Sequence, residues 1–231
     1  MDKAALAHVL VGREPEAILR TLAMMAYNPS IGRVLEERGV DKFVELMNTM
    51  VPKLYGAQTA RQDFDKWHAD SCDCILSTFK TARGEALSYG QAQKPLNVFL
   101  KVYVDWARQP GRELADKLAT WLHVPLDSVV MKFMSREFAS DYENRVVAVR
   151  RRRIERLTER LGSLGHKCTG AIARRLVGNE FSLAAIDRET YIAWQELFRD
   201  LWPAKPVQLD IVWVLERRPS PETGAENGEV V

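Results

Sequence analysis

Two stretches of the sequence decide the fold: Ser88–Trp106 reads SYGQAQKPLNVFLKVYVDW, and Leu122–Val130 reads LHVPLDSVV. In the first stretch, a turn at Gly90 leads into a predicted helix over 94–107, with Pro95 in its first turn and Lys94 and Lys101 on one face. In the second, Asp127 directly precedes an apolar run and is well placed to cap a further helix. The two stretches therefore predict neighbouring helices that present two lysines and a carboxylate.

The same helical period extends over most of the chain, and convincing alternating strand patterns are absent. We expect an all-α fold, a compact multi-helix single domain over residues 1–216, in one body or in two packed halves around a central cleft. From Pro219 onward the sequence PSPETGAENGEVV predicts a flexible, disordered tail over 217–231. The predicted helices lie near residues 15–27, 41–54, 60–81, 94–107, 112–122, 128–138, 142–161, 167–177 and 188–201, with a last turn at 209–215.

Composition excludes several classes of protein. The chain has 231 residues, of which 46% are hydrophobic and 28% charged, so a mostly disordered chain is excluded. No apolar run is long enough for a membrane span, and the first residues do not resemble a signal peptide. Three cysteines, an odd number, favour reduced thiols. We therefore expect a cytoplasmic protein without a membrane partner, and we expect it to be a monomer.

Positive charge is concentrated in one part of the chain. The formal net charge is only +2, yet residues 145–175 hold ten lysines and arginines against Glu155 and Glu159. Within this stretch, Arg150, Arg151, Arg152 and Arg153 follow one another and sweep most of a helix circumference. One interpretation is a surface that contacts the phosphate backbone of DNA. The other is a solvated helix whose glutamates form local ion pairs.

Most motifs for metal or cofactor chemistry are missing. His68 and the pair Cys72 and Cys74 suggest a metal site, but a C-x-C spacing on a helix splays its thiolates and no second pair completes a tetrahedron. Core cysteines are the better interpretation. The sequence also lacks a glycine-rich phosphate loop and an H-x-x-x-H pattern. We therefore expect no metal and no small-molecule cofactor.

The order of these motifs resembles that of the helix-hairpin-helix DNA glycosylases, in particular the archaeal-type 8-oxoguanine DNA glycosylases. The resemblance rests on a Q-K-x(6)-K pattern that ends at Lys101, and on the V-P-x-D segment 33 residues after Lys94. A second match near the C-terminus pairs a tryptophan-bearing helix with a P-x-x-L-D segment at Asp210 and a later Trp213. Together the matches span Ser88–Val130 and Arg188–Glu216, about a third of the chain.

The resemblance implies a DNA repair enzyme that flips a damaged base out of double-stranded DNA. Lys94 would then be the nucleophile that attacks C1′ and forms a Schiff base, and Asp127 would assist it. The resemblance also implies that Lys101, Phe99, Pro125, Asp210 and Trp213 lie around the base and that the hairpin at Gly90 contacts the DNA backbone. The concentration of charge adds Arg150, Arg151, Arg152 and Arg153 to the expected backbone contacts.

Other interpretations remain open from the residues alone. Lys94 could be an ordinary surface lysine and Asp127 an ordinary helix cap. The chain could be a non-catalytic helical module that binds nucleic acid or protein through the basic 145–175 surface. It could also be a helical interaction protein of a defence or mobile-element system. A glycosylase predicts that Lys94 and Asp127 meet in one cleft beside Asp210 or Trp213.

Overall fold

The computed structural model describes residues 14–32, 34–36, 39–55, 60–166 and 169–216. Every regular element in these ranges is a helix, and extended pairing is limited to two isolated β-bridges, so the predicted all-α fold is confirmed. The predicted tail, 217–231, lies outside the described residues. A search of the described helices for one long and apolar enough to cross a bilayer gave none.

The helices follow the predicted order with small shifts at their ends. The predicted helix over 142–161 is the tail of a longer run that begins at Ala139 and includes a π-helical segment. The elements are α2 (Glu14–Ser30), α3 (Gly39–Leu54), α4 (Arg61–Thr78), α5 (Tyr89–Leu100), η1 (Lys101–Trp106), α6 (Arg112–Ala119), α7 (Ser128–Glu137), α8 (Ala139–Tyr142), η2 (Glu143–Val147), α9 (Ala148–Ser163), α10 (Thr169–Val177), η3 (Leu183–Ala185), α11 (Arg188–Leu201), η4 (Pro206–Ile211) and α12 (Val212–Leu215).

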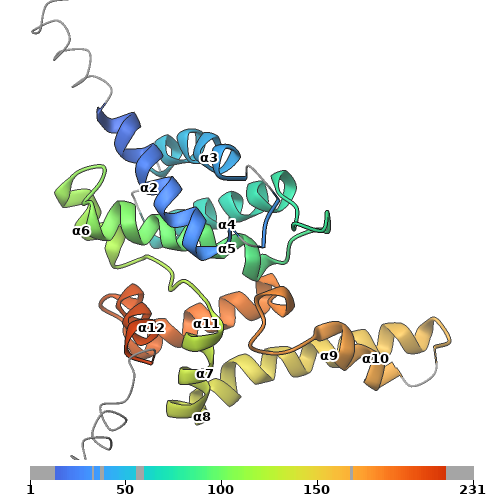
Figure 1. The fold of residues 1–231 in the computed structure, drawn as a ribbon. Coiled ribbons are helices and arrows are strands. Elements are labelled where there is room, and N and C mark those ends of the chain that lie inside the picture. The colour runs from blue at the N-terminus through green and yellow to red at the C-terminus, as the bar shows by residue number, and fades with distance from the viewer. Residues whose placement is uncertain (1–13, 33, 37–38, 56–59, 167–168, 217–231) are drawn as a thin grey trace, which may run out of the picture.

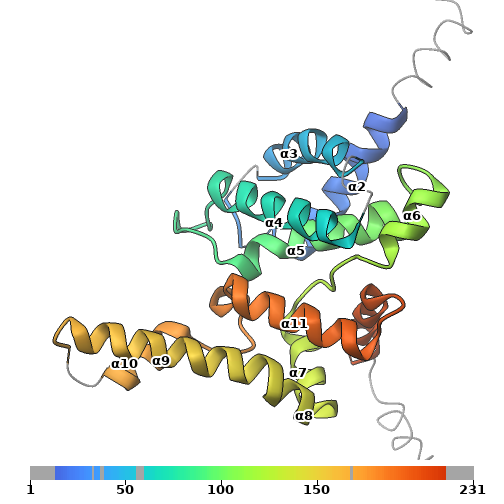
Figure 2. The same ribbon diagram turned by 180° about the vertical axis from the view of Figure 1, so that it is seen from behind.

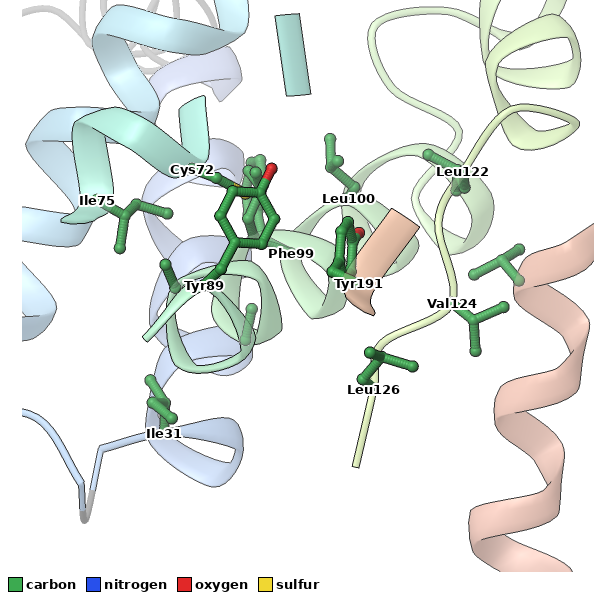
Figure 3. Close-up of a cluster of buried hydrophobic side chains, with 14 of the residues drawn as sticks. Ile31, Cys72, Ile75, Tyr89, Phe99, Leu100, Leu122, Val124, Leu126 and Tyr191 are labelled. Carbon is green, nitrogen blue, oxygen red and sulfur yellow. The ribbon is translucent and has the colours of Figure 1, made fainter. Parts of the chain in front are cut away.

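The helices gather in two layers. Figures 1 and 2 show α2 to α6 in one layer and α7 to α12 in the other, with α9 and α10 side by side as an arm that extends away from the rest. A single hydrophobic cluster includes residues of both layers. Figure 3 shows part of it, where α5 meets the segment before α7 and Tyr191 of α11; the side chains that it labels there are Phe99, Leu100, Leu122, Val124, Leu126 and Tyr191.

Helix α5 begins five residues earlier than the sequence pattern predicts. The Ser88 hydroxyl accepts a hydrogen bond from the Gln91 amide, and the Gln91 side chain accepts one from the Ser88 amide. This reciprocal capping box satisfies two amides that a helix start leaves without partners. Pro95 therefore lies inside the helix rather than in its first turn.

After Leu100 the helix continues as the π-helix η1, which shifts the rotation of the residues that follow. The continuation carries Lys101, Asp105 and Trp106 onto the side of the helix that faces the second layer, where they line one pocket. In an α-helix each residue is rotated by about 100° from the one before it, and in a π-helix by less, so Asp105 and Trp106 stay closer to the face of Lys101 than in a continuous α-helix. The π-helix is therefore part of what builds the candidate site.

Candidate active site: a lysine–aspartate pocket

A pocket of about 760 Å³ lies between α5 and η1 on one side and η4 and α12 on the other. Ligand pockets typically have on the order of 300–1,000 Å³, so this one has room for a nucleobase-sized group. Its walls are mainly apolar, and its polar members come from three separate parts of the chain. The lining residues are Met25, Lys94, Val98, Lys101, Val102, Asp105, Trp106, Pro125, Asp127, Val207, Gln208, Asp210, Ile211 and Val214.

Lys94 and Asp127 meet in this pocket although 33 residues separate them. The Lys94 Nζ donates a hydrogen bond of 3.2 Å to Asp127 Oδ2. Both side chains are mostly shielded from water, with exposed fractions of 15% and 12%. Asp127 also caps α7, because its Oδ1 accepts hydrogen bonds from the amides of Val129 and Val130 at 2.9 Å. The cap fixes the carboxylate, and the carboxylate in turn fixes the amine.

A second pair lies beside the first. Lys101 Nζ is 2.5 Å from Asp210 Oδ2, and both side chains are about four-fifths buried. The same ammonium group lies 5.0 Å from the centre of the Trp106 ring, within the range of a cation–π contact. Trp106 itself is 63% exposed, which is unusual for a large aromatic residue and leaves a ring face available at the pocket.

A third pair, which the sequence reasoning did not identify, extends the series. Lys205 donates a hydrogen bond to Asp105, and Asp105 lines the pocket. The spacing of Asp105 four residues after Lys101 was the available signal, because such residues share a helix face. Lys205 could not be linked to it, since the two residues are a hundred positions apart. Two lysine–aspartate pairs therefore line the pocket, and a third reaches it through Asp105 alone.

A buried polar network supports the segment that carries Asp127. The Gln195 side chain on α11 accepts a hydrogen bond from the Val124 amide and donates one to the Val124 carbonyl, both 2.9 Å long. Asn97 on α5 donates to Gln93 and to the Tyr191 hydroxyl. The Gln195 contacts hold the turn before Asp127 against α11, and the Asn97–Tyr191 contact holds α11 against the helix that carries Lys94. Both join elements that are far apart in sequence, whereas the Asn97–Gln93 contact lies within α5.

The network continues to two buried histidines. His68 contacts Asn97 at 2.6 Å, while His123 contacts both the Tyr191 hydroxyl and Asp65. Burial lowers the pKa of His123 to about 4 and that of His68 well below its ordinary value. Burial alone would raise the pKa of Asp65, but hydrogen bonds with His123 and Arg199 outweigh it and hold that pKa well below its usual range.

We expect the free energy of unfolding to fall as the pH drops from about 6.5 to about 4. The unfolded chain binds protons there that buried His123 does not, and each pH unit costs about 1.4 kcal/mol at such a group. His68 acts in the same direction, and Asp65 extends the loss below its ordinary pKa because its folded pKa is depressed. Urea unfolding at pH 7, 5.5 and 4.5 measures the slope.

Two variants make this measurement specific. His123→Asn should flatten the pH dependence, whereas His166→Gln should leave it unchanged because His166 is exposed. Equal stability of the wild type at pH 7 and pH 4.5 would contradict the assignment of neutral buried histidines.

Of two further residues expected at the site, Pro125 and Phe99, the structure places only the first in the pocket. Pro125 lines the pocket. Phe99 does not: its ring is fully buried, packs edge-on against Phe43 and stacks on Tyr103. The neighbouring Val98 faces the pocket instead, because one residue is a rotation of about 100° on a helix. The side chain of Trp213 lies outside the described part of the structure.

The expected DNA contacts of Gly90 also need correction. Its amide donates to the Ile186 carbonyl at 3.0 Å, so that amide is not available to a phosphate. A Cβ at this position would lie 2.4 Å from the Leu183 carbonyl oxygen. Glycine is therefore required for the close approach of α5 to the η3 segment.

Part of the arginine cluster is neutralised by acidic residues from other elements. Arg151 pairs with Glu143, Arg153 with Asp187, Arg156 with Glu189, and Arg145 with Asp200. Arg150 is buried, with 7% of its surface exposed, and its Nη2 donates to the Gly178 carbonyl. Of the four consecutive arginines at positions 150–153, Arg152 is exposed and makes no ion pair with a described residue. Arg150 is therefore not a solvent-facing member of the expected DNA-contacting surface, and among the described contacts the arginines pair with acidic residues outside 145–175 rather than with Glu155 or Glu159.

Comparison with known proteins adds no assignment: the chain matches no protein family, no curated protein and no solved structure. The fold and the pocket therefore define the molecule only as an all-helical protein with a lysine–aspartate site.

Proposed function

We propose that this protein is a DNA glycosylase with lyase activity that excises an oxidised purine, such as 8-oxoguanine, through Lys94. The observation that carries the proposal is the 3.2 Å contact between Lys94 and Asp127 inside a pocket large enough for a flipped base. An amine held beside a carboxylate, largely out of water, suits nucleophilic catalysis.

The proposed reaction starts from a nucleotide rotated out of the duplex, because C1′ cannot be reached inside the stack. Asp127 accepts a proton from the Lys94 ammonium, and the free amine attacks C1′. The bond from C1′ to the base breaks as the base takes up the proton that Asp127 received. The C1′–O4′ bond then breaks and O4′ takes a proton from the Lys94 nitrogen, which leaves a protonated Schiff base between Lys94 and C1′. Loss of a C2′ proton from this Schiff base expels the 3′-phosphate.

The second pair supplies recognition in this scheme. Lys101 presents a donor and Asp210 an acceptor next to each other, so a base that offers an acceptor and an N–H group on one edge satisfies both. The apolar walls and the exposed face of Trp106 provide stacking surfaces for a planar ring.

Borohydride trapping on a duplex with one 8-oxoguanine tests the proposal. Reduction of the Schiff base leaves a stable covalent protein–DNA adduct, which we expect with the wild type and not with Lys94→Gln. Lys101→Gln is the matched control: it removes a lysine from the same pocket, so it should weaken binding but still permit trapping at saturating DNA. An adduct with Lys94→Gln would show that another residue is the nucleophile. The absence of an adduct with the wild type and with every variant, on any oxidised purine, would refute the proposed lyase activity.

A further inference from the structure

A second pocket lies on the arm formed by α9 and α10, and it shares no residue with the lysine–aspartate pocket. Its volume is about 300 Å³, at the lower end of the range for ligand sites. Three arginines and one glutamate line it, so its charge is predominantly positive. The lining residues are Val147, Arg150, Arg151, Ile154, Arg174, Val177, Gly178 and Glu180.

Arg150 is the unusual member of this pocket. Its side chain is more than nine-tenths buried, and only one of its terminal nitrogens, Nη2, has a hydrogen-bond partner, the Gly178 carbonyl at 2.9 Å. The other, Nη1, is closed to solvent and has no partner among the described residues. A buried charged donor without an acceptor is costly, so such groups in native proteins call for an explanation.

Neighbouring residues do not compensate this charge fully. Glu180 is near enough to act on Arg150 electrostatically, but burial outweighs it and the pKa of Arg150 is lowered. Arg151 already pairs with Glu143 in an exposed ion pair. Arg174 is exposed at the pocket and has no ion pair with a described residue. The pocket therefore holds more donors than acceptors.

We propose that this pocket binds a phosphate group between Arg150 and Arg174. A phosphate supplies several acceptor oxygens, and a guanidinium fork matches them with paired N–H donors. A phosphate bound there would give the unpartnered Nη1 of Arg150 an acceptor, while Nη2 already has one in the Gly178 carbonyl. The site does not depend on the function proposed for Lys94, and either result there leaves it standing.

Adjacent arginines on α10 provide a sharp test. Arg174 lines the pocket, whereas Arg175 does not, and both are exposed on the same helix. Calorimetric titration with inorganic phosphate, at constant ionic strength kept with sodium chloride, should show saturable binding to the wild type. Arg174→Gln should weaken it roughly tenfold, and Arg175→Gln should change it by less than about twofold. Thermal melting of both variants checks that they fold.

The same variants identify the source of the phosphate. If an undamaged DNA duplex is weakened more by Arg174→Gln than by Arg175→Gln, and inorganic phosphate competes with it, the occupant is a backbone phosphate. If only inorganic phosphate distinguishes the variants, the occupant is a free phosphorylated molecule. An absence of saturable phosphate binding, or equal losses in both variants, would overturn the proposal.

Discussion

Asp127→Asn is expected to keep the cap of α7 and to lose base excision by about 10²–10⁴-fold per folded molecule, the range that a positioned acid–base group contributes. Asparagine keeps an oxygen that can accept hydrogen bonds from the amides of Val129 and Val130, and it is as good a helix cap as aspartate. It lacks the negative charge that faces Lys94 at 3.2 Å. The variant therefore separates the two roles of one side chain.

Asp187→Asn is the matched control for this prediction. Asp187 caps α11 through the Thr190 amide, as Asp127 caps α7, but it does not line the pocket. Asparagine at position 187 keeps the cap, and the substitution changes no residue of the pocket. The single-turnover rate of excision should therefore be within about threefold of the wild-type rate, a difference below about 0.7 kcal/mol in activation free energy. An Asp127→Asn enzyme that excises at the wild-type rate would show that Asp127 is a structural cap alone.

The second large effect concerns stability rather than chemistry. Phe99→Ala should lower the free energy of unfolding by about 3–5 kcal/mol, because a fully buried phenyl ring is replaced by a cavity. Trp106→Ala, nearby in the same helical run, removes a larger ring that is 63% exposed and should cost about 0.5 kcal/mol or less. Urea unfolding of the two variants compares them directly.

The outcome also decides between two placements of the aromatic residue. If Phe99 lies in the core, its truncation destabilises the protein and leaves DNA binding per folded molecule unchanged. If it faces the substrate, as the sequence alone suggested, truncation changes binding with little effect on stability. A near-zero change in unfolding free energy would contradict the packing of Phe99 on Phe43 and Tyr103.

Much of the local structure could be predicted from the sequence because its signals are local. Asp127 begins α7 as the predicted cap, and the apolar period marks the helix faces. The spacing of Lys94 and Lys101 placed both on one face, and both line the pocket. A missed local signal was the capping box at Ser88, which moves the start of α5.

The errors arose where contacts join distant residues. The acidic partners of the arginines lie on η2, at the start of α11 and at its end, so counting charges within 145–175 overstated the free positive charge. The choice between Val98 and Phe99 depends on one residue of helix rotation. The network through His68 and Gln195 depends on four elements meeting, which no periodicity reports.

The two lysine–aspartate pairs that line the pocket have a consequence for selectivity. Lys94 and Lys101 are each paired with a carboxylate, so a ligand that binds either lysine has to compete with Asp127 or Asp210. A ligand that binds Lys101 and displaces it from Asp210 leaves a largely buried carboxylate without a partner, and the free-energy cost of that unpaired charge is large. A molecule that replaces both halves of the pair avoids it. The site is therefore expected to select mainly against ligands that leave Lys101 or Asp210 without a hydrogen-bond partner, as sites built on buried hydrogen-bonding groups do.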